Sequence, residues 1–470
     1  MRSTKIVATV GPASREPEVL ERMLRAGVDV ARLNFAHADP HHHGETAARV
    51  RAAAREVGRE LALLADVPGP KLRIGPVKDG VADLGRGTDV VLTPERVEGT
   101  PQRLPVAWEG LAELVDEGDI CYLADGAVRL RVDAVRQDEV LATVEVGGSV
   151  ASRQGINLPN MTMSLPAVSD EDLQLIDAAL DMGVDLIALS FVKRREDLEQ
   201  VREHLATRDS DVPLIAKIEK PQAASNGEEI VEAADGVMIA RGDLGIELPI
   251  EQVPLVQKRL LSLAGRKAKA TITATQMLES MVHSERPTRA EVADVANAIF
   301  DGTDAVMLSQ ETAVGDHPVQ AVAMMAAIAR ATERELPYGR WLAERGPRAS
   351  NQYQAIAFGA VGGVYQLGLK AIVCPTRTGT TARLISAYRP QAPVLALSPR
   401  RDIVRRCQLL WGVHGAVLEE PMDTLDLIDA CAQAAVREGM AEPGDKIGIT
   451  AGLPAGKAGG TNLFKVHTVE

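Results

Sequence analysis

Polar and charged side chains recur two residues apart near the ends of short apolar runs in this sequence. Residues two apart in a β-strand face the same side, so each pair presents two functional groups together if its run forms a strand. Three such pairs are Arg32 with Asn34, Lys217 with Glu219, and Ser309 with Glu311. Other apolar runs end near single polar residues, namely Asp66, Arg241, Asp243 and Thr275.

These residue types suit the binding of a metal ion and an anion. Glu219 and Asp243 have no histidine or cysteine near them in the sequence, which favours a hard cation such as Mg²⁺ or Mn²⁺. Lys217 and Arg32 beside such a cation favour an anionic, phosphorylated substrate. Any one of these residues could be an ordinary loop residue, because loops begin where strands end. Several charged pairs on one rim are better explained by a shared site.

The apolar runs alternate with amphipathic stretches along most of the chain. This alternation predicts parallel strands joined by helices. Eight such units predict an α/β protein with a closed (β/α)8 TIM barrel, in which the chemistry lies at the carboxyl ends of the strands. The eight runs span residues 5–10, 30–36, 61–67, 186–192, 213–219, 236–242, 270–277 and 304–311.

Two interruptions of this alternation predict further domains. Residues 71–160 are rich in valine, glycine and charge and alternate with period two, which predicts a β lid domain inserted after strand three. It divides the barrel into a first part at 1–70 and a second part at 161–335. A second α/β pattern predicts a C-terminal α/β domain over 336–470.

The composition excludes several classes of protein. The net charge of −13 argues against a nucleic-acid surface, although a local group of cations could still bind a small phosphorylated ligand. The four cysteines are far apart and form no CxxC pair, which argues against a zinc site or a disulfide framework. No apolar run approaches membrane-spanning length, and the N-terminal segment lacks the core of a signal peptide. We therefore expect a cytoplasmic protein that binds neither nucleic acid nor membrane.

Six segments together resemble the pyruvate kinase family, of the bacterial type. They are "ARLNFAH", "IAKIE", "MIARGDLGIEL", "ATQMLESM", "RPTRAEVADVANAIFDGTDAVMLSQETAVGDHP" and "GINLPN", and the resemblance covers nearly the whole chain. The family fold has a barrel, a lid inserted after strand three and a C-terminal effector domain, which matches the architecture predicted above. The resemblance implies transfer of a phosphoryl group from phosphoenolpyruvate to ADP, giving pyruvate and ATP in the last step of glycolysis. It also implies a homotetramer.

The resemblance assigns roles to the rim residues one by one. Glu219 and Asp243 match the ligands of the divalent metal, Mg²⁺ or Mn²⁺, which neutralises charge that develops on the enolate. Lys217 matches the cation that stabilises the phosphoryl group during transfer, and Arg32 matches its partner on the phosphate.

The remaining assignments concern the enolate, its carboxylate and the nucleotide. Together with Asp243, the backbone at Arg241 and Gly242 matches the substrate site, where glycine permits close approach to the carboxylate. Thr275 matches the hydroxyl near the methylene carbon that receives the proton. The nucleotide-side positions are Asn34, His37, Arg73 and Arg153, although Gln154 replaces a lysine that is common beside the last of these.

Lys71 lies in "ADVPGPKLRIG", and its position after a turn with two prolines favours a solvated hinge lysine. The resemblance favours another interpretation. Potassium-dependent members hold the ion with Asn, Ser and Asp side chains and a backbone carbonyl, and carry glutamate where this chain has Lys71. The matching positions here are Asn34, Ala36, Asp66 and Val67, so the serine hydroxyl is missing. The lysine ammonium could supply the positive charge of potassium, which predicts an enzyme that does not require this ion.

The segment "TRTGTTAR" follows a predicted strand, opens a predicted helix and is rich in hydroxyl groups. Such a turn can bind phosphate, or it can be an ordinary helix cap. The family places a loop for a sugar-phosphate or nucleotide effector here. The loop residues are Thr376, Arg377, Thr378, Gly379, Thr380 and Thr381.

Two other motifs suggest a phosphate-binding loop and a metal-binding histidine cluster, and the surrounding sequence supports neither. In "GLPAGKAGGT", Lys457 is followed by Ala458 and a predicted strand, whereas a phosphate-binding P-loop needs Ser or Thr and then a helix. The histidines at 41–43 follow Pro40 at the start of an amphipathic stretch, so we expect a solvated helix start there.

Three functions remain open: a pyruvate kinase, a metal-enolate lyase acting on a pyruvate-like acid, and a non-catalytic metabolite sensor. The two cations Lys217 and Arg32, together with the lid, favour phosphoryl transfer over a lyase. The intact set of Lys217, Glu219, Asp243 and Thr275 argues against a sensor.

Overall fold

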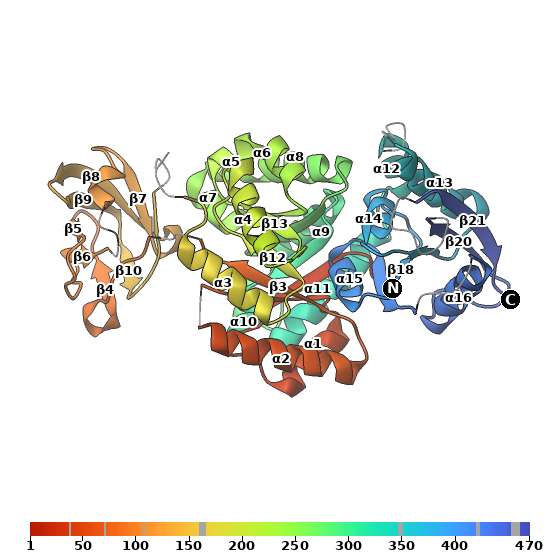
Figure 1. Ribbon diagram of the computed structural model, residues 1–470. Coiled ribbons are helices and arrows are strands. Elements are labelled where there is room, and N and C mark those ends of the chain that lie inside the picture. The colour runs from red at the N-terminus through yellow and green to blue at the C-terminus, as the bar shows by residue number, and fades with distance from the viewer. Residues whose placement is uncertain are drawn as a thin grey trace.

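The computed structural model arranges the chain as three parts in a row, with the barrel in the middle (Figure 1). A small β-sheet lid lies at one end of the barrel and an α/β domain lies at the other. The structure describes residues 1–36, 39–69, 72–106, 108, 110–158, 166–345, 351–419, 424–452 and 461–470.

The eight predicted runs form the eight parallel strands of a closed barrel, which confirms the predicted fold class. The strands pair in the order β1-β16-β15-β14-β13-β12-β3-β2. They are buried along most of their length, because helices cover the outside of a parallel barrel and side chains fill its inside. Their bounds are β1 (Lys5–Thr9), β2 (Val30–Asn34), β3 (Ala62–Val67), β12 (Leu186–Leu189), β13 (Leu214–Ile218), β14 (Gly236–Ala240), β15 (Ala270–Ala274) and β16 (Ala305–Leu308).

Helices surround the barrel, and several begin with the capping patterns that the sequence carries. The hydroxyl of Ser169 accepts from the backbone N–H of Asp172 before α3, and Thr288 and Glu291 form the same capping box before α9. The helices are α1 (Pro17–Ala26), α2 (Pro40–Val57), α3 (Asp170–Asp181), α4 (Arg195–Thr207), α5 (Pro221–Ser225), α6 (Gly227–Ala233), α7 (Arg241–Glu247), α8 (Val253–Arg266), α9 (Arg289–Phe300), α10 (Gln310–Ala313) and α11 (Pro318–Glu333).

The histidines at the start of α2 only partly match the prediction. His41 is exposed, as expected, but His43 is buried and stacks on the ring of Phe35, with the ring centroids 4.5 Å apart. The expectation of a solvated helix start is therefore wrong at His43, which lies on the face of the helix that packs inward.

The lid consists of two sheets that follow β3 in the chain and precede α3. A six-stranded sheet has the order β11-β7-β8-β9-β5-β6, and β10 pairs with β4. Alternate residues of these strands are buried in a core of the lid's own, as the period-two pattern predicts. The strands are β4 (Val81–Leu84), β5 (Asp89–Thr93), β6 (Arg103–Pro105), β7 (Ile120–Leu123), β8 (Val128–Arg136), β9 (Glu139–Val146), β10 (Gly148–Ala151) and β11 (Ile156–Asn157).

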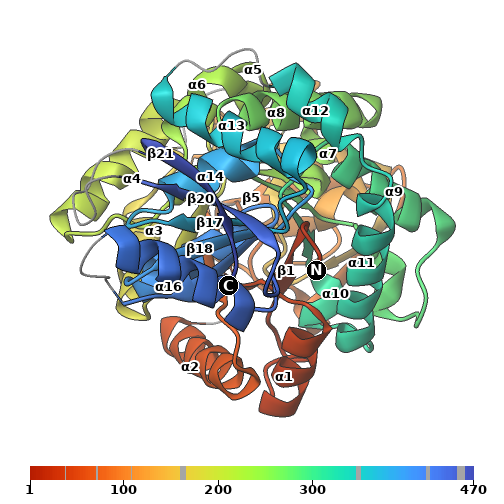
Figure 2. The same ribbon diagram turned by 90° about the vertical axis from the view of Figure 1, so that its right-hand side faces the viewer.

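The C-terminal domain has a five-stranded sheet in the order β19-β18-β17-β20-β21, with only β21 antiparallel to its neighbour. Figure 2 views the molecule from this domain, with the barrel behind it. Its elements are α12 (Tyr338–Arg345), α13 (Gln352–Leu367), β17 (Ile372–Pro375), α14 (Thr380–Ala387), β18 (Val394–Ser398), α15 (Arg401–Arg406), β19 (Val413–Val417), α16 (Thr424–Arg437), β20 (Lys446–Ala451) and β21 (Leu463–Thr468). No helix in the described part of the chain is long and apolar enough to span a membrane.

Buried polar contacts join the C-terminal domain to the amino ends of the barrel strands. The ammonium of Lys5, the first residue of β1, donates to the carbonyl of Val413 at 2.5 Å. The fully buried guanidinium of Arg389 pairs with Asp304, directly before β16, at 2.6 Å. The carboxyl ends of the strands therefore face away from this domain, toward the lid (Figure 1).

Candidate active site

Lys217 is buried at the carboxyl end of β13, and three groups contact its ammonium. The ammonium lies 3.0 Å from Asp66 Oδ1 and 2.9 Å from Glu219 Oε1, and it donates to Ser190 Oγ at 2.7 Å. Burial alone would lower the pKa of Lys217, but Asp66 and Glu219 outweigh it and raise that pKa above its usual range. Lys217 therefore stays charged, and it shares one side with Glu219 as the spacing predicts.

Asp66 lies between two cations at the ends of neighbouring strands. Its Oδ2 accepts from Arg32 Nε at 2.6 Å, while Lys217 lies at its other oxygen. Burial would raise the pKa of Asp66, but Lys217 and Arg32 together hold it below its usual range. Arg32 also donates to Thr9 Oγ1 at 2.9 Å. Two fixed positive charges thus stand at this rim, where they could contact a phosphate group.

Glu219 and Asp243 are suited to a divalent cation. Glu219 is buried, and its Oε2 accepts from the backbone N–H of Phe191 at 3.0 Å. Burial raises the pKa of Glu219, and the neighbouring charge of Asp243 raises it further, against the effect of Lys217. Such a carboxylate favours a nearby cation. Within the described ranges no three His, Cys, Asp or Glu residues form a metal cluster. The two carboxylates could supply hard oxygen ligands of the kind that Mg²⁺ prefers.

Asp243 lies in the first turn of α7, a helix that begins directly after β14. The guanidinium of Arg241, the first residue of this helix, binds both oxygens of Asp294 at 2.7 Å. The same guanidinium donates to the backbone carbonyl of Thr275 at 2.9 Å. The side chain of Arg241 is thus engaged by Asp294 and Thr275, and the binding of a substrate by the backbone at Arg241 and Gly242 stays a prediction.

Thr275 adopts a strained conformation at the end of β15. Its φ of 72° and the φ of 53° at Gln276 lie in the left-handed region, which β-branched residues rarely occupy. The hydroxyl of Thr275 accepts from the N–H of Gly242 and donates to the carbonyl of Ala274, both at 2.6 Å. A Cβ at Gly242 would lie 3.3 Å from this hydroxyl. Thr275 is therefore held in one orientation against the start of α7.

The pair Ser309 and Glu311 does not extend the rim as predicted. β16 ends at Leu308, and Glu311 lies in the short helix α10 with no exposed surface. Its carboxylate accepts from the backbone N–H groups of Ser309 at 2.6 Å and Leu278 at 3.1 Å. The prediction of a same-side strand pair is wrong here, because the chain turns into a helix before Ser309 and Glu311 can alternate.

The predicted nucleotide-side residues divide between the barrel rim and the lid. Asn34 ends β2 in register with Asp66, and its Oδ1 accepts from the N–H of Ala36 at 3.3 Å. At the base of the lid, Arg73 donates to the carbonyl of Arg153 at 3.1 Å, so these two lie together. His37, Lys71 and Lys457 lie outside the described residues.

Two residues that contact members of the site were missed in the sequence. Ser190 follows β12 directly, so the rule that located the other rim residues could also have found it. Asp294 lies within α9 and carries no such signal, because its partner Arg241 belongs to a different βα unit.

The predicted effector loop lies at the opposite end of the barrel, between β17 and α14. Thr376 Oγ1 accepts from the N–H of Gly379 at 2.9 Å, and the hydroxyls of Thr378 and Thr380 lie 3.0 Å apart. The N-cap position is Gly379, with a φ of 80° and no side-chain cap. One hydroxyl of the loop, that of Thr376, thus satisfies a backbone N–H at the start of the helix, while Thr378 and Thr380 bond to each other. Thr381 bonds to Thr461 at 2.7 Å, and Arg377 is exposed.

Comparison with known proteins identifies relatives along the whole chain. Residues 1–322 match the family described as "Pyruvate kinase, barrel domain", and residues 354–467 match "Pyruvate kinase, alpha/beta domain". The chain is 42% identical over 472 residues to the pyruvate kinase of Geobacillus stearothermophilus, across 100% of this chain and 80% of that protein. It is 42% identical over 473 residues to that of Staphylococcus saprophyticus, across 100% and 81%. It is also 42% identical over 472 residues to that of Thermococcus litoralis, across 99% and 98%.

Proposed function

Because the chain belongs to the pyruvate kinase family, we propose that it transfers the phosphoryl group of phosphoenolpyruvate to ADP with Mg²⁺ or Mn²⁺ and without potassium. The observation that carries this proposal is the buried Lys217, which stays charged among Asp66, Glu219 and Ser190. A fixed ammonium in a site that excludes water stabilises the charge of a phosphoryl group during transfer without reorganisation. Arg32, held by Asp66, supplies a second cation to the same phosphate.

Glu219 and Asp243 would hold the divalent metal, which would neutralise the charge that develops on the enolate oxygen. Their suitability rests on two hard carboxylate oxygens and on the raised pKa of Glu219. The backbone at Arg241 and Gly242 would bind the substrate carboxylate at the start of α7. The N–H of Gly242 donates to Thr275 Oγ1 in this structure, so it would exchange that hydrogen bond for one to the carboxylate, and Thr275 would keep its bond to the carbonyl of Ala274.

Thr275 would serve the second half of the reaction, in which the methylene carbon of the enolate takes up one proton. Its hydroxyl is fixed by Gly242 and Ala274, so it is already oriented before substrate binds. ADP would bind on the side of the lid, near Asn34, His37, Arg73 and Arg153. The expected products are one pyruvate and one ATP for each phosphoenolpyruvate.

Independence of potassium rests on the charges around Asp66 and on the side chains near it. The carboxylate of Asp66 is already neutralised by Arg32 and Lys217. Ala36 provides no hydroxyl ligand. Lys71 would supply the remaining positive charge beside the substrate.

The test of this part is activity in buffers that contain only sodium or tetramethylammonium. The wild type should be fully active there, because the ammonium of Lys71 supplies the positive charge that potassium would otherwise bring. Lys71→Glu should lose most of its activity, and potassium should restore it better when Ala36→Ser is added. A wild-type enzyme that stays nearly inactive until potassium is supplied would overturn the proposed role of Lys71.

We further propose a cytoplasmic homotetramer whose activity responds to a phosphorylated effector at the loop Thr376–Thr381. Exposed apolar side chains on the barrel support self-association: Ile250 and Leu255 expose 71% and 67% of their surface. The organised hydroxyls of Thr378 and Thr380 support the effector site. Light scattering would measure the mass of the assembly, and a monomer at working concentrations would contradict this assignment.

A coupled assay separates the proposed reaction from the two alternatives. A pyruvate kinase forms pyruvate from phosphoenolpyruvate only when ADP is present. A lyase needs no ADP, and a sensor forms no pyruvate at all. Pyruvate formation without ADP, or none with it, would therefore refute the proposal.

A further inference from the structure

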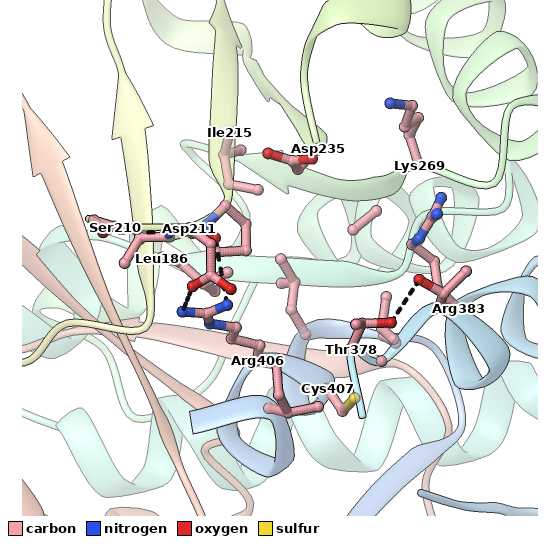
Figure 3. Close-up of a pocket in the computed structure, with 18 of the residues that line it drawn as sticks. Leu186, Ser210, Asp211, Ile215, Asp235, Lys269, Thr378, Arg383, Arg406 and Cys407 are labelled. Atoms are coloured by element: carbon pink, nitrogen blue, oxygen red, sulfur yellow. Dashed lines mark hydrogen bonds and ion pairs between the residues drawn. The ribbon is translucent and has the colours of Figure 1, made fainter. Parts of the chain in front are cut away.

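A tight turn follows β12 and places two residues, Ser190 and Phe191, beside the candidate active site. The hydroxyl of Ser190 accepts from the ammonium of Lys217 at 2.7 Å. The backbone N–H of Phe191 donates to Glu219 Oε2 at 3.0 Å. The first residue of β12, Leu186, borders a cavity of about 380 Å³ at the opposite end of the barrel, beside the C-terminal domain (Figure 3). The turn therefore lies at the lid end of the barrel, with the length of β12 between it and that cavity.

The backbone of Phe191 adopts a conformation that bulky residues rarely occupy. Its φ of 56° lies in the left-handed region, where the Cβ of an L-residue crowds the following carbonyl oxygen. Such strain persists only where the surrounding structure holds it in place, and it is concentrated at functional sites. The contacts of the Phe191 side chain must therefore offset the strain of its backbone.

Two contacts hold the ring of Phe191. The first is with Gly69, in the segment that leads from β3 to the lid: a Cβ at Gly69 would lie 2.9 Å from Phe191 Cδ2, so only glycine permits this close approach. The second is with the ammonium of Lys220, which lies over the ring at 5.3 Å from its centroid, within the range of a cation–π contact. Lys220 also pairs with Glu247, the last residue of α7, at 2.5 Å. The ring is thus connected both to the lid segment and to the helix that carries Asp243.

Gly69 is itself fixed at the base of the lid. Its N–H donates to Asp172 Oδ1 at 3.1 Å, and the other oxygen of Asp172 accepts from the N–H of Ser169 at 2.8 Å. Gly69 precedes the lid in the chain and Ser169 follows it, so Asp172 holds both connections between the lid and the barrel. Gly69 therefore presents a fixed surface to the ring of Phe191.

We propose that Phe191 is a positioning residue for the metal site: its ring holds the left-handed turn, and the turn directs the backbone N–H at Glu219 Oε2. Lys217 lies at the other oxygen, so Glu219 is fixed in one orientation before a metal binds. Each oxygen keeps a lone pair for the cation. Contacts of this kind orient metal ligands, and their loss lowers metal affinity about 10- to 100-fold. This inference rests on the proposed metal site of Glu219 and Asp243.

Binding of Mn²⁺ alone to the full chain, measured by electron paramagnetic resonance of the free ion, tests the proposal without any catalytic step. Phe191→Ala removes the ring, so the strained turn relaxes, the N–H leaves Glu219, and Mn²⁺ should bind at least about tenfold more weakly. Phe191→Gly also removes the ring, but glycine adopts a positive φ without strain. It should therefore bind Mn²⁺ more tightly than Phe191→Ala. If Phe191 only filled space, the glycine variant would bind no better, because it leaves the larger void.

A second variant displaces the ring without changing Phe191 itself. Gly69→Ala places a Cβ 2.9 Å from Phe191 Cδ2, so the ring must shift, and Mn²⁺ binding should weaken about tenfold. The matched control is Gly58→Ala. Gly58 has nearly the same φ, 69° against 66°, but the described residues place no atom within 4 Å of a Cβ there, apart from its neighbours in the chain. Both alanines carry the same backbone strain and should lower the temperature of unfolding, whereas only Gly69→Ala should lose affinity for Mn²⁺.

Glu219→Gln separates the role of Phe191 from the proposed metal site. If Glu219→Gln binds Mn²⁺ like the wild type, or if the wild type binds none, the metal site is misassigned and the role of Phe191 is refuted with it. If Glu219→Gln weakens binding while Phe191→Ala and Gly69→Ala bind like the wild type, only the role of Phe191 is refuted. Thermal unfolding identifies any variant that fails to fold, and Gly69→Ala keeps the test valid if Phe191→Ala does not fold.

Discussion

Replacing Lys217 with methionine removes the ammonium but keeps a side chain of similar length. Lys217 lies 3.0 Å from Asp66 and 2.9 Å from Glu219, and the same rim carries Arg32 and Asp243. The five formal charges sum to −1 in the wild type and to −2 in the variant. A phosphoryl group in transfer would meet one cation fewer and an uncompensated carboxylate.

The size of the effect follows from the position of the charge. A unit charge about 4 Å from a reacting group contributes about 4 kcal/mol at an effective dielectric constant of about 20. A barrier higher by about 4 kcal/mol lowers turnover about a thousandfold. Binding of phosphoenolpyruvate should weaken much less, because the metal and the backbone of Arg241 and Gly242 remain.

The measurement is steady-state pyruvate formation over a range of phosphoenolpyruvate concentrations, with thermal unfolding recorded for each protein. Lys220→Met is the matched control, because Lys220 is also a largely buried lysine and pairs with Glu247 at 2.5 Å. The control loses a comparable ion pair but no charge facing the proposed phosphoryl position, so it should keep at least about a tenth of wild-type turnover. If Lys217→Met itself keeps a tenth of wild-type turnover, the proposed role of Lys217 is refuted.

Three further perturbations test other parts of the account. Glu219→Gln and Asp243→Asn should each raise the Mg²⁺ requirement sharply, because each removes one of two charged ligands; an unchanged Mg²⁺ titration would mean that the ligands are misassigned. Thr378→Ala combined with Thr380→Ala should abolish activation by phosphorylated effectors and leave basal activity intact, as saturation curves for phosphoenolpyruvate would show. Burial lowers the pKa of His414 from 6.5 to about 3, so stability should fall as the pH drops below about 6.5, where only the unfolded chain takes up the proton. At pH 5 this protonation lowers the free energy of unfolding by about 2 kcal/mol, and His414→Gln should abolish that loss. An unchanged pH dependence of thermal unfolding in the variant would contradict it.

The barrel could be predicted because each of its strands is a short apolar run that recurs at regular intervals. Strand periodicity also placed Lys217 and Glu219 on one side, since both lie at the end of one strand. The same rule failed at Ser309 and Glu311, where the chain leaves the strand early and Glu311 becomes a buried acceptor for backbone N–H groups. Periodicity indicates which way a side chain points only while the strand continues.

Contacts between distant elements could not be predicted from the chain. Asp294 fixes Arg241, and through it the carbonyl of Thr275, from a helix that belongs to another unit of the barrel. The contacts of Lys5 with Val413 and of Arg389 with Asp304 depend on how the C-terminal domain packs on the barrel. No local pattern in the sequence encodes such contacts, because the two residues that meet are far apart in the chain and come together only when the chain folds.

The central claim is that this site couples phosphoenolpyruvate to ADP. The most direct test quantifies pyruvate and ATP together after purified protein is mixed with phosphoenolpyruvate, ADP and Mg²⁺ in tetramethylammonium buffer. The account predicts one ATP for each pyruvate, and no pyruvate when ADP is omitted. Pyruvate formed without ADP, or no product in the complete mixture even after potassium is added, would contradict it.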